Sequence, residues 1–210
     1  MILSKSIKHG WYYHYKIETE KVEKVKKKGF ESLTNFLHRV RTNRPDSYFV
    51  DGPRSSQVKT PFSITYQNTP HKVCYFARMG VESNYYDDNH MNVQMFMLGY
   101  DTQTFAMEIP VWIEPQEINK YKDIFGTNKP LTGHIDLLRI ENNKVWVWDY
   151  KPNAHTEKKA HHQVILYTLM IHLRTNIPLD NLRCGYFDDK KAYSISPESI
   201  KQLKEYVKTV

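Results

Sequence analysis

Two aspartates and a lysine share one face of a predicted β-hairpin, GHIDLLRIENNKVWVWDYKP, at residues 133–152. The hairpin turns at the Asn-Asn pair 142–143, because asparagine tolerates the positive φ that a two-residue loop requires. Counting outward from this turn places Asp136 directly opposite Asp149, as a non-hydrogen-bonded pair whose side chains lie close together. Lys151 follows on the same face as Asp149, since side chains alternate along a strand.

Paired carboxylates in this position favour a divalent cation. Like charges directly opposite each other destabilise a sheet. A hard cation between Asp136 and Asp149 would remove the repulsion, because such cations take carboxylate oxygens as ligands. Phosphodiester hydrolysis needs an activated water and a positive centre for the developing charge, and one or two Mg²⁺ or Mn²⁺ ions supply both. Lys151 is then placed to hold the water or the phosphate.

The elements that must position this hairpin follow from hydrophobic periodicity. Residues 105–114 are predicted as a strand, and the apolar run 160–176 as a helix with one face on the sheet. A strand at 181–189 has a candidate partner in AYSI (192–195). A helix over 18–42 is predicted to be broken or bent near Gly29, and strands are predicted at 63–66 and 72–76 around a turn at 68–70. A further helix is predicted over 83–99, with Asp87 or Asp88 near its cap and Gly99 after its end, and a last helix starts at Ser196-Pro197.

Three motifs in this order are specific: GHID (133–136), DYK (149–151) and QVILY (163–167). Together they resemble the PD-(D/E)XK nuclease superfamily, in its RecB-like exonuclease branch. Stand-alone archaeal or viral nucleases and CRISPR-associated nucleases also represent this branch. With the strand before and the segment after, the resemblance extends over roughly 105–195. It implies an α/β fold with a central mixed β-sheet flanked by helices, as in a restriction-endonuclease-like core.

The resemblance also implies how a metal would be held. Asp136 and Asp149 would bind Mg²⁺ or Mn²⁺, together with the main-chain carbonyl of Tyr150. Lys151 would act on the attacking water or the scissile phosphate. The alternative is a pair of surface aspartates beside an extended lysine, without a metal.

Further site residues are expected on the neighbouring elements. Gln163 and Tyr167 are i and i+4 on the helix, so they would line the site from one face, where they contact the DNA backbone or brace the lysine. RecB-like members carry a metal-binding histidine on a helix upstream of the sheet, and His90 occupies the matching place. Glu108 is a candidate additional ligand, with Glu114 as its competitor. The alternatives are an ordinary helix surface for Gln163 and Tyr167 and an exposed or satisfied imidazole for His90.

Cysteine and histidine counts argue against other metal centres. The CRISPR-associated members hold an iron–sulfur cluster on four cysteines, whereas this chain has only Cys74 and Cys184, so no cluster is expected. Both cysteines are predicted to be buried thiols in a reducing, cytoplasmic compartment. A zinc site built from His134, His161 and His162 is disfavoured, because their spacing matches no known pattern.

Positive charge is concentrated at the start of the chain. Residues 1–60 contain 13 Lys and Arg against 6 Asp and Glu, whereas the rest of the chain contains 17 of each. We predict a basic, mainly helical N-terminal region over 1–60 of the same domain and a nuclease core over 61–210. Aromatic residues and lysines are interleaved within 1–16. This pattern suits either a surface that binds unpaired bases or an edge strand that packs on the rest of the domain, and the edge strand is favoured. Six lysines are expected to bind nucleic acid: Lys24, Lys26, Lys27, Lys28, Lys158 and Lys159. For the four lysines at 24–28, the alternative is an ordinary solvated face of a helix.

The predicted function is a metal-dependent deoxyribonuclease that acts on single-stranded DNA or DNA ends. The alternatives are a structure-specific or restriction-type endonuclease and a catalytically silent nucleic-acid-binding subunit. No GxxxxGK[ST] motif occurs, so a helicase or recombination partner would be a separate chain. No apolar run approaches the ~20 residues of a membrane helix, and no secretory signal is expected.

Overall fold

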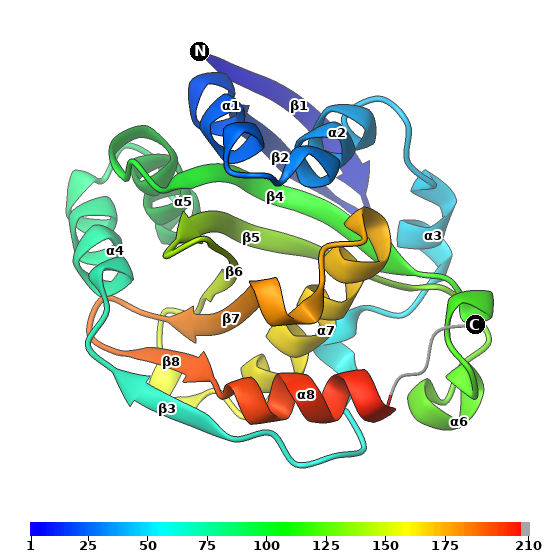
Figure 1. Ribbon diagram of the computed structural model, residues 1–210. Coiled ribbons are helices and arrows are strands. Elements are labelled where there is room, and N and C mark those ends of the chain that lie inside the picture. Colours follow the sequence, from blue (N-terminus) through cyan, green and yellow to red (C-terminus); the bar gives the residue numbers. More distant parts are fainter. Residues whose placement is uncertain (207–210) are drawn as a thin grey trace.

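The Asn-Asn pair 142–143 joins two central strands of an eight-stranded sheet. Both asparagines have positive φ, 49° and 54°, as the predicted turn requires. The strand pairing runs from Glu141↔Lys144 to Leu137↔Trp148, which confirms the predicted hairpin register. The computed structural model describes residues 1–206 (Figure 1).

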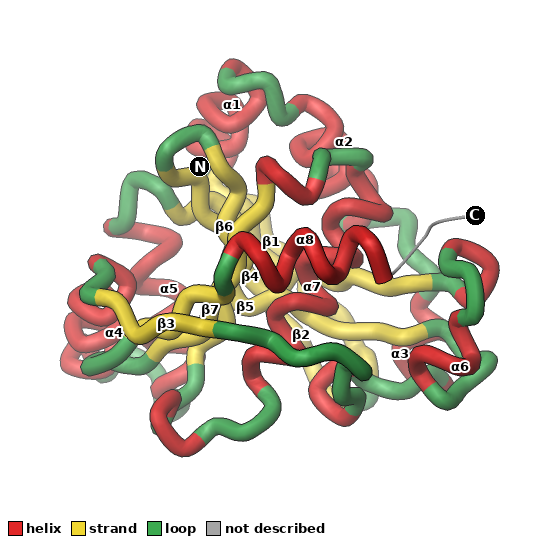
Figure 2. Tube along the Cα trace, turned by 60° about the horizontal axis from the view of Figure 1, so that its bottom comes forward, coloured by secondary structure: helices red, strands yellow, loops and turns green. Residues whose placement is uncertain are grey.

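The sheet is mixed, with the order β1-β2-β4-β5-β6-β7-β8-β3. Neighbouring strands are antiparallel except β6 and β7, which are parallel because a helix connects them. The short β3 lies at one edge of the sheet (Figure 2). The strands are β1 (Ile2–His9), β2 (Trp11–Glu18), β3 (Tyr66–Thr69), β4 (Thr104–Ile113), β5 (Leu131–Glu141), β6 (Lys144–Tyr150), β7 (Leu182–Phe187) and β8 (Ala192–Ile195).

Helices cover both faces of the sheet, which confirms the predicted α/β class. The α-helices are α1 (Thr19–Lys27), α2 (Glu31–Val40), α3 (Asp46–Asp51), α4 (Lys72–Ser83), α5 (Asn89–Tyr100), α6 (Tyr121–Phe125), α7 (Ala160–Thr175) and α8 (Pro197–Tyr206). Four short 3₁₀ helices are η1 (Ser55–Gln57), η2 (Pro115–Glu117), η3 (Ala154–Thr156) and η4 (Leu179–Asn181). The predicted C-terminal helix also included residues 207–210, which lie outside the described residues.

The apolar core forms two clusters, one on each face. The larger cluster packs α1, α2 and α7 against β4 and β5, and the smaller one packs α4 and α5 against the other face (Figure 1). The α7 helix, which connects the parallel strands β6 and β7, is buried on nearly all sides, because Val164 to Ile171 is an unbroken buried run. The site helices are thereby fixed on the sheet by burial of apolar surface.

The first 60 residues contain a strand hairpin as well as helices. Strand β2 pairs antiparallel with β4 through Lys16↔Met107, and β1 pairs with β2 at the edge of the sheet. The predicted edge strand is therefore confirmed, as one half of a hairpin. The predicted break of the 18–42 helix near Gly29 is also confirmed, since Gly29 has φ +89° between α1 and α2.

Three local predictions were wrong. Residues 72–76, predicted as a strand, belong to helix α4. The buried positions Val73, Ala77 and Gly80 follow a helical period. The five residues 72–76 are too short a segment to show that period, and their composition favours a strand. The strand expected at 63–66 lies at Tyr66–Thr69, across the predicted turn, where it gains β8 as a partner. Helix α5 starts at Asn89 and ends at Tyr100, so that Gly99 lies inside it rather than after it.

The cap prediction for α5 was correct. The Asp88 carboxylate accepts hydrogen bonds from the backbone N–H groups of His90 and Met91. This cap fixes the first turn of α5, and with it the backbone of His90. None of the described helices combines the length and apolar character needed to span a lipid bilayer.

Candidate active site

Three carboxylates lie side by side on three adjacent strands. The register of β4 with β5 places Glu108 opposite Asp136. Continuing the register of β5 with β6 by one residue beyond Leu137↔Trp148 places Asp136 opposite Asp149. All three carboxylates are buried, so their mutual repulsion is weakly screened.

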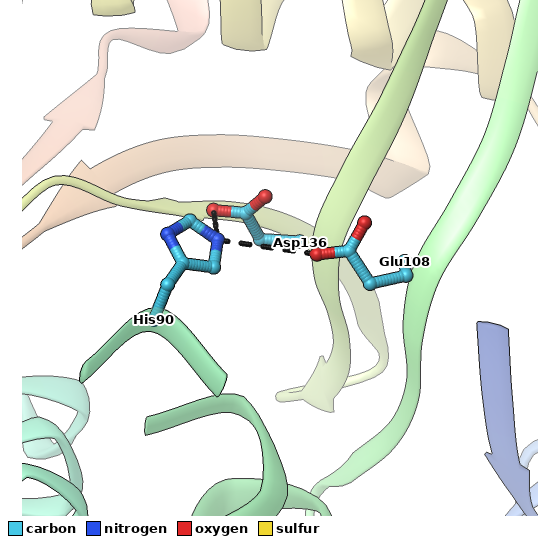
Figure 3. A group of neighbouring side chains, drawn as sticks. All are labelled: His90, Glu108 and Asp136. Carbon is cyan, nitrogen blue, oxygen red and sulfur yellow. Dashed lines mark ion pairs between the residues drawn. The ribbon is translucent and has the colours of Figure 1, made fainter. Parts of the chain in front are cut away.

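Asp136 is the centre of this row. Its Oδ2 accepts a hydrogen bond from the backbone N–H of Tyr150 at 2.8 Å and lies 3.0 Å from Nε2 of His90. The same imidazole nitrogen lies 4.0 Å from Oε1 of Glu108, and that oxygen accepts a 2.6 Å hydrogen bond from the amide of Gln94. Figure 3 shows the imidazole of His90 turned toward both carboxylates.

These groups fit a hard divalent cation. The ligand atoms of His90, Glu108 and Asp136 all lie within 4.8 Å of one another, and among the described residues no other such trio is found. Nε2 of His90 lies 3.0 Å from the Asp136 carboxylate and 4.0 Å from that of Glu108, so one ion could be held by all three residues.

The pKa values in this row are shifted by burial and by the neighbouring charges. Burial raises the pKa of Asp149 to about 7, and the Asp136 carboxylate adds to the shift. The same two causes raise the pKa of Glu108 to about 7. Burial lowers the pKa of His90, but the neighbouring carboxylates, with Asp136 contributing most, together outweigh it and raise that pKa to about 9. The imidazolium in turn holds the pKa of Asp136 below its usual value despite burial. A cation could take the place of these protons.

Lys151 lies at the end of β6, beside the row. Its ammonium contacts the Asp149 carboxylate at 2.7 Å, and its backbone N–H donates to the carbonyl of Phe187. Burial lowers the pKa of Lys151, but Asp149 and Asp136 raise it by more, so this side chain remains a cation. The structure therefore places a fixed positive charge next to the carboxylates.

The predicted helix pair contacts this group from α7. The amide of Gln163 donates to the Tyr167 hydroxyl at 2.8 Å, and both side chains are buried. The ring of Tyr167 lies against Gly133, since a Cβ at that glycine would be 2.2 Å from Cε1 of the ring. Ser55 packs at the same point, with its Oγ 2.8 Å from that Cβ position. Gly133 is thus needed for close approach of α7 to β5.

A chain of two histidines and an aspartate links the N-terminal hairpin to β5. Nε2 of His9 lies 2.8 Å from Oδ1 of Asp46, and its Nδ1 lies 2.9 Å from Nε2 of His134. Because a carboxylate only accepts, we assign the Nε2 proton of His9 to the bond with Asp46. Burial lowers the pKa of both imidazoles, so Nδ1 of His9 accepts from His134. This chain connects β1, α3 and β5.

A cavity of about 310 Å³ collects these groups. It contains the carboxylate row, Lys151, His90 and the α7 pair. The segment before residue 60 supplies much of the opposite wall. The lining residues from that segment are Tyr12, Tyr13, His14, Phe49, Arg54 and Ser56.

Comparison with protein families identifies this arrangement. The family model of the PD-(D/E)XK nuclease superfamily matches residues 75–209. The chain belongs to this superfamily. Its mixed sheet with flanking helices agrees with a restriction-endonuclease-like PD-(D/E)XK fold, and nucleases of the superfamily use divalent metals. No curated protein and no solved structure matched in the corresponding searches.

Most of the predicted site residues of this PD-(D/E)XK protein meet in the cavity. Those that line it are His90, Glu108, Asp136, Asp149, Lys151, Gln163 and Tyr167. Tyr150 contacts the row through its N–H, and its main-chain carbonyl stays a predicted ligand. Glu114 lies elsewhere, near Trp112 and Arg174. His162 bonds to Thr60 instead of joining a metal cluster.

The predicted lysines lie outside this cavity. They are exposed on α1 and in the connection before α7: Lys24, Lys26, Lys27, Lys28, Lys158 and Lys159. The lysine and the arginine that do line the PD-(D/E)XK cavity are Lys151 and Arg54. Sequence reasoning missed Arg54 because no motif surrounds it. Gln94 was also missed, although its i, i+4 spacing from His90 would have indicated a shared helix face.

Proposed function

We propose that this protein is a metal-dependent deoxyribonuclease that acts on single-stranded DNA or DNA ends, as a RecB-like member of its superfamily. The observation that carries this proposal is the convergence of Glu108, Asp136, Asp149 and Lys151 in one cavity. A structural role would not require three buried carboxylates in a row, since such a row destabilises the sheet.

The ligands would be His90, Glu108, Asp136 and Asp149, with the Tyr150 carbonyl. An Mg²⁺ or Mn²⁺ ion held by them would activate water and neutralise charge on the scissile phosphate. Their oxygen-rich composition favours these hard cations.

The protein groups then have separate tasks. Lys151 would leave Asp149 for the scissile phosphate or the attacking water, which it can hold as a fixed cation. Tyr167 and Gln163 would keep Lys151 and the DNA backbone in place, since their mutual hydrogen bond fixes both side chains. Gln94 would orient Glu108 through the 2.6 Å bond, in the way that outer partners orient metal ligands.

The test is degradation of end-labelled single-stranded DNA with Mg²⁺, Mn²⁺ or EDTA. We expect metal-dependent cleavage that falls at least about a hundredfold in Asp149→Ala and in Lys151→Ala. The matched controls are Asp123→Ala and Lys122→Ala, which alter exposed side chains on α6 and should cleave like the wild type. Equal cleavage by the site variants would show that the site is wrongly assigned. Binding without cleavage under every metal would favour a silent nucleic-acid-binding subunit.

Circular single-stranded DNA separates the two modes of cleavage. An obligate exonuclease leaves the circle intact, as we expect, whereas a structure-specific or restriction-type endonuclease opens it. These 210 residues contain no GxxxxGK[ST] motif, so unwinding of duplex ends would depend on a helicase or recombination partner outside them.

A further inference from the structure

The tip of the β1–β2 hairpin presents two aromatic rings to solvent. Trp11 is 76% exposed and Tyr12 is 66% exposed, so none of the described elements covers either ring. The turn is at Gly10, so both rings follow directly on the turn. The two rings lie on opposite faces of β2, and at this exposure each buries little apolar surface against the fold.

Strand β2 of the hairpin borders the active-site cavity. Tyr12 and His14 are two residues apart on β2, so they share a face, and both line the cavity, as does Tyr13 from the other face. Lys8 lies opposite Tyr12 in the register, with its ammonium 5.9 Å from the centroid of that ring. An exposed aromatic ring with a cation beside it therefore borders the cavity that holds the carboxylate row.

Two cations near the rings are free of carboxylates. Within residues 1–206, neither Lys8 nor Arg54 forms an ion pair with an acidic side chain. The guanidinium of Arg54 lies 5.7 Å from the centroid of Tyr13 and donates one hydrogen bond to the carbonyl of His9 at 3.1 Å. A guanidinium carries five N–H donors in a planar fork that suits phosphate oxygens.

The hairpin tip is held firmly against the active-site strand. Besides the bonds of His9 with Asp46 and His134, the His9 ring stacks on Phe49 at 4.0 Å. The rings of Tyr13 and His134 stack at 3.5 Å with an angle of 3° between their planes. His134 is two residues from Asp136 on β5. These contacts fix the distance between the exposed rings and the carboxylates, so binding there would order few groups.

We propose that Tyr12, on the face with Lys8, and Trp11, on the opposite face of β2, form a two-sided stacking platform at the hairpin tip. The unpaired bases of a nucleic acid strand would stack there, and its phosphates would contact Lys8 and Arg54 on the way to the carboxylate row. Bases stack on aromatic rings without sequence preference, whereas the bases of a duplex are already stacked and paired. The platform would therefore select single strands over duplex. This proposal rests on the proposed function and names the element that selects its substrate. That element lies outside the family match, which begins at residue 75.

Binding is measured in EDTA by fluorescence anisotropy, with a labelled single-stranded oligonucleotide and the matching duplex at one ionic strength. We expect Trp11→Ala and Tyr12→Ala each to weaken single-strand binding roughly 5- to 150-fold and duplex binding much less. Tyr12→Phe keeps the ring and should bind like the wild type. Tyr75→Ala removes an exposed ring on α4, outside the cavity lining, and should also bind like the wild type.

Two further probes separate base stacking from a general loss of affinity. An abasic strand keeps its phosphates but lacks bases, so wild type and Tyr12→Ala should bind it equally. Trp11 is the exposed tryptophan among the described residues, and single-stranded DNA should quench its emission. Trp11→Phe should lose that quenching but keep binding.

The outcomes are decisive for the platform and separate it from the cleavage assignment. Unchanged single-strand affinity in both alanine variants, or equal losses for single strand, duplex and abasic strand, would overturn the proposal. Because no metal is needed for these measurements, a protein without nuclease activity could still pass them, and an active nuclease could fail them.

Discussion

Glu108, Asp136 and Asp149 are held in contact by two strand registers rather than by mutual attraction. Their repulsion is relieved by protons and by two cations, His90 and Lys151. A divalent ion would replace these protons with a stronger positive centre. In the metal-free protein, protons therefore occupy the place that a metal ion would take among these side chains. The stability of the metal-free protein and its affinity for metal should depend on pH.

The pH dependence of stability follows from the raised pKa values of Glu108 and Asp149, both about 7. The folded protein keeps protons on these carboxyls that the unfolded chain has released above about pH 4–5. The free energy of unfolding of the metal-free protein should therefore fall as pH rises toward 7. Mn²⁺ competes with these protons, so the increase in Tm that it causes should be larger at pH 8 than at pH 5.5.

Thermal unfolding with Mn²⁺ and with EDTA at both pH values checks this prediction. Asp149→Asn carries no titrating group at this position, so its metal-free stability should depend less on pH than that of the wild type. Asp123→Asn on α6 is the control and should follow the wild type. A Tm increase that is the same at both pH values would contradict proton displacement at this site.

The Asp136–Asp149 pair could be predicted from sequence because a two-residue turn fixes the register on both sides. The position of Glu108 was harder to predict. Its φ of +54° interrupts the alternation of β4, so that Met107 and Ile109 lie in different core clusters. A non-glycine residue with positive φ costs about 1–3 kcal/mol of folding free energy, and the surrounding fold must stabilise it. No local pattern within residues 105–114 indicates this conformation.

At the element scale, the contact between α7 and β5 depends on the absence of a side chain at residue 133. Gly133→Ala would place a methyl group 2.2 Å from the Tyr167 ring, and β5 and α7 are both too well packed to yield freely. We expect a loss of about 1–3 kcal/mol in stability and a marked loss of cleavage, because Tyr167 and its bond with Gln163 would shift.

Gly99→Ala is the matched control, since nothing lies within 4 Å of the added methyl group and the residue is inside α5. Its stability should be unchanged or slightly higher, because alanine favours a helix over glycine. Denaturant unfolding and the cleavage assay measure both variants. Wild-type cleavage by Gly133→Ala would contradict the role of Tyr167 at the site.

Sequence patterns predicted long elements well and short ones poorly. The run 160–176 and the strand 105–114 contain enough residues to show their periods, and both formed as expected. The five residues 72–76 were too few to distinguish a strand from the first turn and a half of α4. The strand β3 exists because β8 supplies a partner 123 or more residues later in the chain, and no local signal contains that information.

In the whole molecule, the basic N-terminal quarter of the chain divides into two parts that lie in different positions relative to the cavity. The hairpin tip and Arg54 form one wall of the cavity. Helix α1, with Lys24, Lys26 and Lys27 and with Lys28 at its C-cap, follows the other end of the hairpin, away from the Gly10 turn. The excess of positive charge can be counted from the sequence alone. Its division into two parts could not be predicted from the sequence, because folding of the hairpin separates them.

The α1 lysines should therefore matter only for long strands. Changing all four to glutamine should reduce the salt dependence of binding to a strand of about 40 nucleotides, by about 0.7 in log–log slope for each phosphate that is no longer neutralised. A strand of about 10 nucleotides, which is within the size of one small binding site, should show an unchanged slope. An unchanged slope for both lengths would mean that these lysines are only a solvated helix face.

If the carboxylate row binds a divalent cation, anomalous diffraction at the manganese absorption edge will locate that ion. Crystals soaked in Mn²⁺ should show an anomalous peak within coordination distance of Asp136, Glu108 and His90, and the peak should vanish in Asp136→Asn. Well-diffracting soaked crystals with no peak in this cavity, or with manganese bound only elsewhere, would show that the carboxylate row is not a metal site.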